Sequence, residues 1–321
     1  MAADGFASSV FLAPMAGITD KPLRRIIHNC GAGNLITEMA AVNAIQFKNP
    51  KSWQIADVHD EPYPVTVQLV GNSPALFADA VRLVTDLGAA AIDINMGCPV
   101  KKIVNNNAGS ALMKDMLLAS QIIEAAVKAT SLKVSVKFRK GWDNEHINAV
   151  EFARMCEQSG ATRLTVHGRT RAQGYSGAAD WEIIKAVKAA VKIPVIGNGD
   201  IDSPQKAQQR MAESGVDGIM IGRALLGNPW LLNATHQYLT NGTEMLLPTV
   251  SQIKEMLLQH IRLLVEYYGE KNGMAVSRKH VSWYVKGLYE AKAFREQYTK
   301  LNELAAAVDL IENFFTKVVE I

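Results

Sequence analysis

Cysteine is scarce in this sequence. The 321 residues include three cysteines, Cys30, Cys98 and Cys156, and no two of them stand in a C-x-x-C pair. A disulfide framework needs paired cysteines, and a structural zinc site needs ligands at short, regular spacings. We therefore expect neither a disulfide framework nor a bound metal ion.

The sequence also lacks a long apolar run and a strong net charge. No uninterrupted apolar stretch approaches the roughly 20 residues of a membrane span, and residues 1–5 show neither the basic nor the apolar part of a secretion signal. A net charge of +3 is too small to indicate a nucleic-acid partner by itself. A hydrophobic content of 48% argues against disorder. We expect a cytoplasmic monomer that does not bind membranes.

Short apolar runs rich in β-branched residues recur along the first part of the chain. Their starts are separated by 24 to 43 residues, which is enough for a strand and a returning helix. Eight such units predict an α/β fold, a (β/α)8 TIM barrel. A doubly wound sheet is the alternative, although it requires no eighth strand of matching length. The predicted strands are residues 10–13, 34–37, 65–68, 91–94, 134–137, 163–166, 193–196 and 218–221.

Helical patterns separate most of these runs, for example over residues 75–87, 116–130 and 147–160. A glycine precedes several of the strands, where a helix commonly ends on a residue with positive φ. The glycines expected at such helix ends are Gly33, Gly88, Gly160 and Gly215.

The remainder of the chain changes character and shows no strand pattern. Thr249 or Ser251 can cap a helix whose apolar residues follow the 3.6-residue period as far as Tyr268. Two further helices are predicted over residues 276–288 and 301–318. We therefore expect a barrel domain over residues 1–240 and an all-helical domain over 241–321, with a linker near residues 241–243.

A polar or functional residue follows nearly every predicted strand. Active sites of such barrels lie at the carboxyl ends of the strands, so these side chains would meet at one mouth. Any single one could equally be an ordinary polar residue at the border of a strand and a loop. The set is Pro14, Met15, Glu38, Gln68, Asn95, Lys137, His167, Asn198 and Arg223.

The last two strands run into glycine-containing turns, Gly197-Asn-Gly-Asp200 and Gly222-Arg-Ala224. Glycines let backbone N–H groups approach an anion, and barrels commonly bind phosphate after strands seven and eight. Arg223 could hold phosphate oxygens in a bidentate way. The alternative is a pair of tight turns that bind no ligand.

Two cations and one thiol stand at other predicted strand ends. Lys137 or His167 could stabilise negative charge on a reduced cofactor ring, or could serve as structural ion-pair partners. Cys98 precedes Pro99, which disfavours a helix, so its thiol lies on an extended loop as a candidate acid or nucleophile. A lone loop cysteine can also be incidental. Cys30 and Cys156 fall in helical patterns and are expected to be core thiols.

Six ordered motifs resemble those of the tRNA-dihydrouridine synthases, and the resemblance runs from about Phe11 to the last helix. Lys101-Lys102 and the stretch SRKHVSWY at 277–284 are similar to the bacterial B-type subgroup. Phe138 and Lys140 depart from the family pattern, in a loop detail only. The six motifs are APMAGITD (13–20), DINMGCP (93–99), VKFR (136–139), VHGRTR (166–171), GNGDI (197–201) and MIGRA (220–224).

The resemblance implies an FMN-dependent barrel enzyme that reduces the C5=C6 bond of uridines in tRNA. NADPH would reduce the flavin, flavin N5 would deliver hydride to C6, and Cys98 would protonate C5. A thiol at its ordinary pKa is mostly protonated at pH 7 and can donate a proton. The cofactor residues implied are Pro14, Met15, Gln68, Lys137, His167, Asn198, Gly199, Asp200, Gly222 and Arg223.

A tRNA substrate requires a flipped uridine and a basic track for the backbone. Residues 271–300 hold seven basic and two acidic residues, a local charge of +5. Such a run can also be a solvated helix face. The residues that the resemblance assigns to RNA are Lys101, Lys102, Arg139, Arg169, Arg171, Arg278, Lys279 and Lys286.

Two other functions stay open beside this one. The chain could be a flavin barrel that reduces a small molecule, although such a substrate needs no basic helical surface. It could also be a tRNA-binding protein without catalysis, although an intact Cys98 and the two glycine turns argue against that function.

Overall fold

The computed structural model describes residues 8–319, and the chain divides into two compact units. The first unit holds the segment that ends at Asp20 together with Gly33–Gly222. The second holds Lys21–Ala32 and the chain from Arg223 onward. A short early segment thus joins the helical part of the chain, which the sequence did not indicate.

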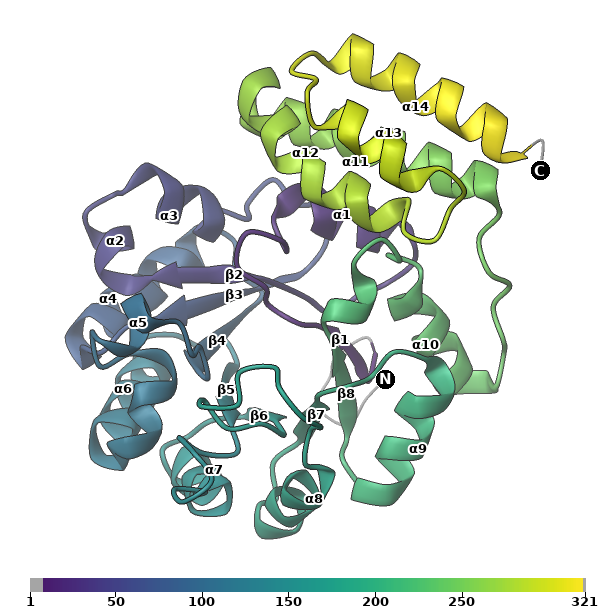
Figure 1. The fold of residues 1–321 in the computed structure, drawn as a ribbon. Coiled ribbons are helices and arrows are strands. Elements are labelled where there is room, and N and C mark those ends of the chain that lie inside the picture. Colours follow the sequence, from purple (N-terminus) through teal and green to yellow (C-terminus); the bar gives the residue numbers. More distant parts are fainter. Residues whose placement is uncertain (1–7, 320–321) are drawn as a thin grey trace. The chain divides into compact units, whose positions relative to one another are not determined.

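The first unit is built on one sheet of eight parallel strands, confirming the predicted barrel (Figure 1). Consecutive strands are neighbours, and β1 pairs with β8, with Val10 opposite Ile219. A bridge between Phe11 and Asn34 links β1 to the start of β2 and so closes the sheet, which rules out a doubly wound sheet. The strands are β1 Val10–Leu12, β2 Leu35–Ala41, β3 Val65–Val70, β4 Ala91–Met96, β5 Val134–Arg139, β6 Arg163–His167, β7 Val195–Asn198 and β8 Gly218–Ile221.

Several strands extend further than the apolar runs predicted. Gln68 and Lys137 were expected at strand ends, but β3 continues for two residues beyond Gln68 and β5 for two beyond Lys137. The reason is pairing with the neighbouring strand: Gln68 lies opposite Asp93 and Lys137 lies opposite Asn95. Pairing with a neighbour therefore keeps polar side chains within the strand. A hydropathy pattern places the end of such a strand too early.

Helices of the first unit follow the strands, and the three predicted ones are confirmed to within about two residues. Side chains of Ser73, Asp115, Asp180 and Ser203 each accept a backbone N–H at a helix start. The helices are α2 Val42–Gln46, α3 Pro50–Ala56, α4 Pro74–Asp86, α5 Lys101–Val104, α6 Met116–Lys128, α7 Ala149–Gln158, α8 Trp181–Ala190 and α9 Pro204–Ser214, with the 3-10 helix η1 Gly109–Lys114.

Three of the four glycines predicted at helix ends have the expected positive φ. Gly215 caps α9 at φ 70°, and Gly88 and Gly160 directly follow the caps of α4 and α7 at φ 89° and 95°. The prediction for Gly33 was wrong, because the chain turns two residues earlier, at Gly31 with φ 92°. The sequence pattern cannot separate two glycines this close together.

The second unit is helical. Thr249 forms a reciprocal capping box with Gln252 at the start of its longest helix, as predicted. The helix expected over 276–288 lies over Glu270–Tyr284, and a short helix at Ala291–Tyr298 was missed. The elements are α1 Lys21–Asn29, η2 Arg223–Leu225, α10 Leu231–Asn241, α11 Val250–Tyr268, α12 Glu270–Tyr284, α13 Ala291–Tyr298 and α14 Leu304–Val319.

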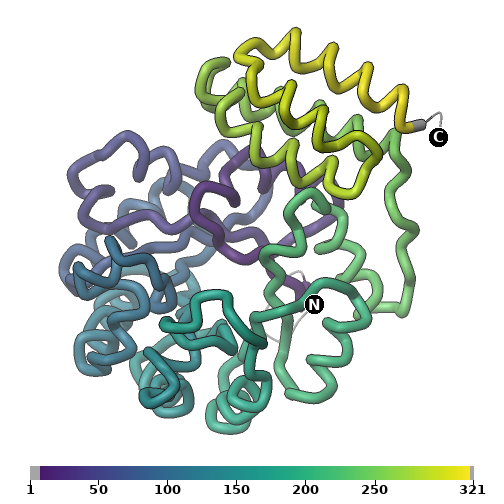
Figure 2. The backbone as a smooth tube through the Cα atoms, in the orientation of Figure 1, coloured from purple at the N-terminus to yellow at the C-terminus, as the bar shows by residue number. Residues whose placement is uncertain are grey.

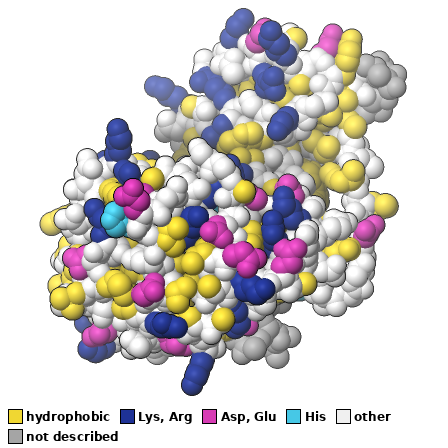
Figure 3. Space-filling view, turned by 60° about the horizontal axis from the view of Figure 1, so that its bottom comes forward, with side chains coloured by type: hydrophobic (Ala, Val, Ile, Leu, Met, Phe, Trp, Pro, Cys, Tyr) yellow, Lys and Arg dark blue, Asp and Glu magenta, His cyan; other side chains and the backbone are white. Residues whose placement is uncertain are grey.

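Helices α11 to α14 share one apolar core that includes Leu257, Met274, Phe294 and Ile311. Gly242 ends α10 at φ 72°, and residues 243–249 run without regular structure to the start of α11 (Figure 2). In Figure 3 the helical unit, at the top of the view, carries several Lys and Arg side chains and few acidic ones. Within residues 8–319, no helix is both long and apolar enough to cross a membrane.

Barrel closure gives a first prediction, which concerns Gly218. A Cβ at this position would lie 2.5 Å from the carbonyl oxygen of Ser9, which accepts the backbone N–H of Ile219. Gly218→Ala should therefore push β1 away from β8 and lower the free energy of unfolding by about 1–3 kcal/mol in urea denaturation. Gly215→Ala is the control, since its Cβ meets nothing within 4 Å and should cost about 1 kcal/mol of left-handed strain. A smaller loss for Gly218→Ala than for the control would contradict the prediction.

Candidate active site

Polar side chains from alternate strands meet across the carboxyl end of the barrel. Lys137 of β5 donates from Nζ to Oδ1 of Asn198 in β7 over 3.1 Å. These strands are not neighbours, so the contact crosses the inside of the barrel. Asn198 in turn donates to the carbonyl of Met220 over 2.9 Å, and His167 lies opposite Asn198 in the pairing of β6 with β7. The predicted residues Lys137, His167 and Asn198 are thus brought together.

The Lys137 ammonium has an unusual environment. Burial lowers its pKa to about 8, and the nearby Arg139 guanidinium lowers it too, while Asp93 and Cys98 act in the opposite direction. Lys137 is therefore largely protonated at pH 7 and loses its proton only slightly above neutrality. A cation held in a poorly hydrated site can stabilise negative charge on a bound ring or phosphate.

The loop after β4 holds Cys98 in a fixed position. The Cys98 carbonyl accepts both the backbone N–H of Ser110, at 3.1 Å, and its hydroxyl, at 2.8 Å. Oδ1 of Asn95 accepts the backbone N–H groups of Gly97, at 3.1 Å, and of Cys98, at 2.9 Å. A Cβ at residue 109 would lie 2.9 Å from the Cys98 carbonyl, so Gly109 is needed for this close approach.

The Cys98 thiol is 9% exposed, and its burial raises its pKa. A hydrogen bond from the Val100 backbone and the charges of Arg139 and Lys137 oppose this effect but do not reverse it. A thiol with a raised pKa stays protonated at neutral pH. This environment suits a proton donor and disfavours a thiolate nucleophile.

One row of polar side chains crosses the four neighbouring strands β3, β4, β5 and β6. Gln68, Asp93, Ser135 and Arg163 lie opposite one another in consecutive strands. Asp93 accepts Nε2 of Gln68 at 2.7 Å and the Ser135 hydroxyl at 2.6 Å. Both ends of the Gln68 amide are engaged, since Oε1 accepts Nδ2 of Asn95 at 2.8 Å. Sequence reasoning missed Asp93 and Ser135 as site residues, although an acidic residue in the middle of an apolar strand was a usable signal.

The turn after β7 requires glycine for steric reasons. At Gly199, with φ 139°, a Cβ would lie 2.4 Å from Cβ of Ala179 and 3.4 Å from Cδ2 of His167. At Gly222, after β8, a Cβ would lie 3.3 Å from Cβ of Ala13 and 3.6 Å from Sδ of Met15. Backbone amides at both turns are therefore bare enough to meet an anion. Pro14 and Met15 follow β1 and are half-buried.

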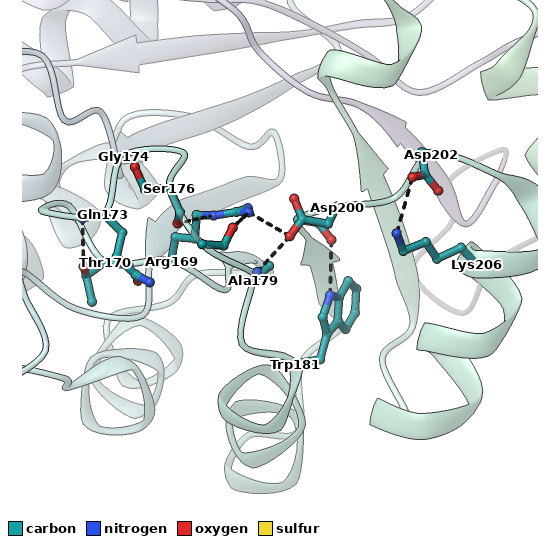
Figure 4. A network of polar contacts seen from close by, with 12 residues as sticks. Arg169, Thr170, Gln173, Gly174, Ser176, Ala179, Trp181, Asp200, Asp202 and Lys206 are labelled. Atoms are coloured by element: carbon teal, nitrogen blue, oxygen red, sulfur yellow. Dashed lines mark hydrogen bonds and ion pairs between the residues drawn. The ribbon is translucent and has the colours of Figure 1, made fainter.

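Asp200 and Arg169 form an ion pair at this turn (Figure 4). Oδ2 of Asp200 accepts Nη2 of Arg169 at 2.8 Å and the backbone N–H of Ala179 at 2.8 Å. Arg169 also donates to the carbonyls of Ser176 and Gly177 and is 2% exposed. The geometry therefore does not support the predicted RNA contact for Arg169, and it gives the Asp200 carboxylate the role of shaping the turn.

Arg139 has a similar internal role. It is 3% exposed, and its Nε donates to the Gly97 carbonyl over 2.8 Å. Its Nη1 donates to the carbonyls of Thr170 and Gly174, each over 2.9 Å. The guanidinium thus joins the Cys98 loop to the loop after β6. The geometry again favours a structural role over the predicted RNA contact, because charge in a sequence does not reveal burial.

The other basic residues predicted for RNA are more open. Lys101 and Lys102 begin α5 and are exposed. Arg171 lies 4.5 Å from the ring centroid of Trp142, which Lys114 also approaches to 4.0 Å. These two cations and one indole were not predicted as a group, because they come from three separate segments, the end of η1 and the loops after β5 and β6.

Four predicted residues belong to the second unit. Arg223 starts η2 and is exposed. Arg278 donates to the carbonyl of Leu301 and to the side chain of Asn302, so its guanidinium is partly engaged. Lys286 is exposed, and Lys279 is half-buried. Among residues 8–319, no group of three or more His, Cys, Asp or Glu side chains is placed to hold a metal ion.

The Arg169 contacts give a second prediction. Arg169→Met removes a buried cation and breaks its ion pair with Asp200, which should lower the free energy of unfolding by about 3 kcal/mol and make residues 170–178 easier to cleave in limited proteolysis. Arg171→Met, the matched control, loses one cation–π contact and should cost about 0.5–1 kcal/mol. An Arg169→Met protein with unchanged stability but weakened RNA binding would restore the original prediction for this residue.

Comparison with known proteins shows which family the chain is similar to. The sequence model of the family described as dihydrouridine synthase (Dus) matches residues 11–319. The chain is 44% identical over 314 residues to a probable tRNA-dihydrouridine synthase of Rickettsia bellii, covering 98% of this chain and 96% of the relative. It is 42% identical over 309 residues to tRNA-dihydrouridine synthase B of Pseudomonas aeruginosa, covering 96% and 93% respectively.

A solved structure supports the fold alone. The 6-hydroxypseudooxynicotine amine oxidase of Pseudomonas geniculata aligns with a TM-score of 0.56 at 14% identity, over 72% of this chain and 47% of that one. The family match, by contrast, spans nearly the whole chain, and it confirms the resemblance seen in the six motifs. The chain therefore belongs to the dihydrouridine synthase family of oxidoreductases.

Proposed function

We propose that this enzyme is an FMN-dependent tRNA-dihydrouridine synthase, which uses NADPH to reduce the C5=C6 bond of uridines in tRNA. The observation that carries the proposal is a buried thiol, Cys98, whose loop is held by hydrogen bonds at the carboxyl end of a barrel that also presents Lys137. Family membership and the names of the similar proteins support the same reaction.

The residues at the mouth fit FMN. The turn at Gly199 leaves no room for a Cβ and the turn at Gly222 leaves little, as expected where backbone amides approach a phosphate. Lys137 offers a cation inside the barrel for the electron-rich ring. FMN would supply the two-electron reductant. The proposed contacts are those predicted, Pro14, Met15, Gln68, Lys137, His167, Asn198, Gly199, Asp200, Gly222 and Arg223, with Asp200 acting through the shape of its turn.

Cys98 would donate the proton that completes saturation of the uracil ring at C5. Its raised pKa keeps the donor form present at neutral pH, and its fixed carbonyl and amide keep the thiol in one place. The same burial limits access of water, which would otherwise compete as a proton source. A fixed donor can also deliver its proton to a single face of the base.

The base must leave its stack to reach this thiol, so we propose a flipped uridine at the mouth. Lys101, Lys102 and Arg171 would contact the RNA backbone near the barrel, and Lys279 and Lys286 would do so on the helical part. We accordingly propose that residues 1–240 carry catalysis and 241–321 carry tRNA binding. Arg278 would contribute with the part of its guanidinium that Asn302 leaves available.

Mass spectrometry of tRNA tests this function. The purified protein, supplied with FMN and NADPH, should form dihydrouridine in unmodified tRNA. Cys98→Ala should keep bound flavin and lower the rate by about 10²–10⁴-fold, because it removes the general acid. Cys156→Ala is the matched control, since Cys156 is fully buried in α7, outside the mouth.

Three results would contradict the proposal. They are no dihydrouridine in any tRNA, reduction of a free pyrimidine or enone in place of tRNA, and a colourless protein that does not take up flavin. Full activity in Cys98→Ala would remove this thiol from the mechanism.

A fourth prediction concerns pH. Because the Lys137 pKa is lowered to about 8, the rate of dihydrouridine formation should fall as pH rises through about 8 and the ammonium loses its charge. Lys137→Arg keeps a cation well above this pH, so its alkaline limb should move upward, even if its maximal rate is lower. Lys128→Arg, an exposed substitution in α6, should leave the limb in place. An alkaline limb at the wild-type pH in Lys137→Arg would contradict this role.

A further inference from the structure

A continuous chain of hydrogen bonds connects the barrel interior with the backbone of Cys98. Asp93, 1% exposed in the middle of β4, accepts Nε2 of Gln68 over 2.7 Å. Oε1 of Gln68 accepts Nδ2 of Asn95 over 2.8 Å. Oδ1 of Asn95 then accepts the backbone N–H groups of Gly97 and Cys98. Two side-chain amides thus stand between a carboxylate and the loop that carries the thiol.

The direction of this chain is determined at its acidic end. A side-chain amide has a donating and an accepting end of nearly equal size, and its partners decide which way it faces. In the structure Gln68 turns its NH2 group toward Asp93 and its oxygen toward Asn95, which is the orientation that an acceptor-only carboxylate imposes. Asn95 must then donate to Gln68, which leaves its oxygen for the backbone amides of Gly97 and Cys98.

Asp93 is costly to bury, and its surroundings offset only part of that cost. Burial raises its pKa, and hydrogen bonds from Ser135 and Gln68 and the charges of Arg163 and Lys137 oppose this effect without reversing it. The Arg163 guanidinium donates to the Ser135 hydroxyl over 3.4 Å and lies 4.6 Å from the Phe11 ring centroid, across the barrel. A buried carboxylate that needs several polar partners is weak evidence for stability and can instead serve to orient those partners.

We propose that Asp93 is a positioning residue for Cys98. Its carboxylate orients the amides of Gln68 and Asn95, and Asn95 in turn holds the amides of Gly97 and Cys98, so that the thiol stays in one buried position. The importance of this positioning for catalysis rests on the proposed role of Cys98 as a proton donor. The positioning itself affects only the reactivity and mobility of the thiol and does not depend on that role.

Alkylation of the thiol by iodoacetamide measures that mobility without substrate. The full-length protein is labelled as purified, and the Cys98 peptide is quantified by mass spectrometry, with half-buried Cys30 as an internal reference. Asp93→Ala should raise the Cys98 rate by about fivefold or more through local opening of the loop. Asp93→Asn keeps an acceptor for Gln68 but adds a donor, so its rate should lie between those of wild type and Asp93→Ala.

A second variant covers the case in which Asp93→Ala does not fold. Gln68→Met interrupts the same chain without creating a cavity and should give a similar increase, with wild type and variant compared at equal flavin content because Gln68 is also a proposed FMN contact. The double variant should be no faster than the faster single one, because both changes break one chain. Ile123→Ala, at a fully buried position in α6, lowers stability without touching the chain and should leave Cys98 alkylation unchanged.

The outcomes separate this proposal from the proposed function. Unchanged Cys98 alkylation in folded Asp93→Ala, or in Gln68→Met if Asp93→Ala is unfolded, would overturn it. An equal increase in Ile123→Ala would also overturn it, because the effect would then reflect general loosening. Since the alkylation rate of Cys98 is measured without forming dihydrouridine, a failure of the proposed function would leave these results intact. Loss of dihydrouridine formation in Asp93→Ala, with rescue in Asp93→Asn, would connect the positioning role of Asp93 with the proposed function.

Discussion

The two hydrogen bonds that Oδ1 of Asn95 accepts from the amides of Gly97 and Cys98 fix the loop on which the site depends. From the other side, the Cys98 carbonyl accepts two bonds from Ser110. Arg139 adds a bond to Gly97 and ties the loop to the next one along the barrel. A loop with its backbone groups satisfied in this way can be buried without penalty, and its thiol needs no rearrangement to act.

Burial then affects the two ionisable groups of the site in opposite directions. It raises the pKa of the Cys98 thiol and lowers that of the Lys137 ammonium, because in each case the charged form is the one that loses hydration. The result is a neutral acid beside a cation that is close to losing its proton. Both states suit a reaction in which electrons arrive at a ring and a proton follows. The loss of hydration on burial therefore accounts for both pKa shifts.

Much of this arrangement follows from the sequence. Eight apolar runs predicted the barrel, and Pro99 predicted a loop at Cys98. Strand ends were less predictable, because pairing with a neighbour extends a strand past its apolar residues, as at Lys137 opposite Asn95. Burial of a charge was not predictable either, since Arg169 finds its partner Asp200 only once two loops meet. Helix α13 was missed because Glu290, at φ 53°, gives it no side-chain cap.

The central claim is that Cys98 acts as the proton donor to a uridine while taking no part in flavin reduction. Stopped-flow measurement of the two half-reactions tests it most directly, with flavin absorbance as the signal. In Cys98→Ala, reduction of the enzyme by NADPH should keep the wild-type rate, and reoxidation by tRNA should slow by about 10²–10⁴-fold. Equal rates of reoxidation in the variant and the wild type would contradict the account.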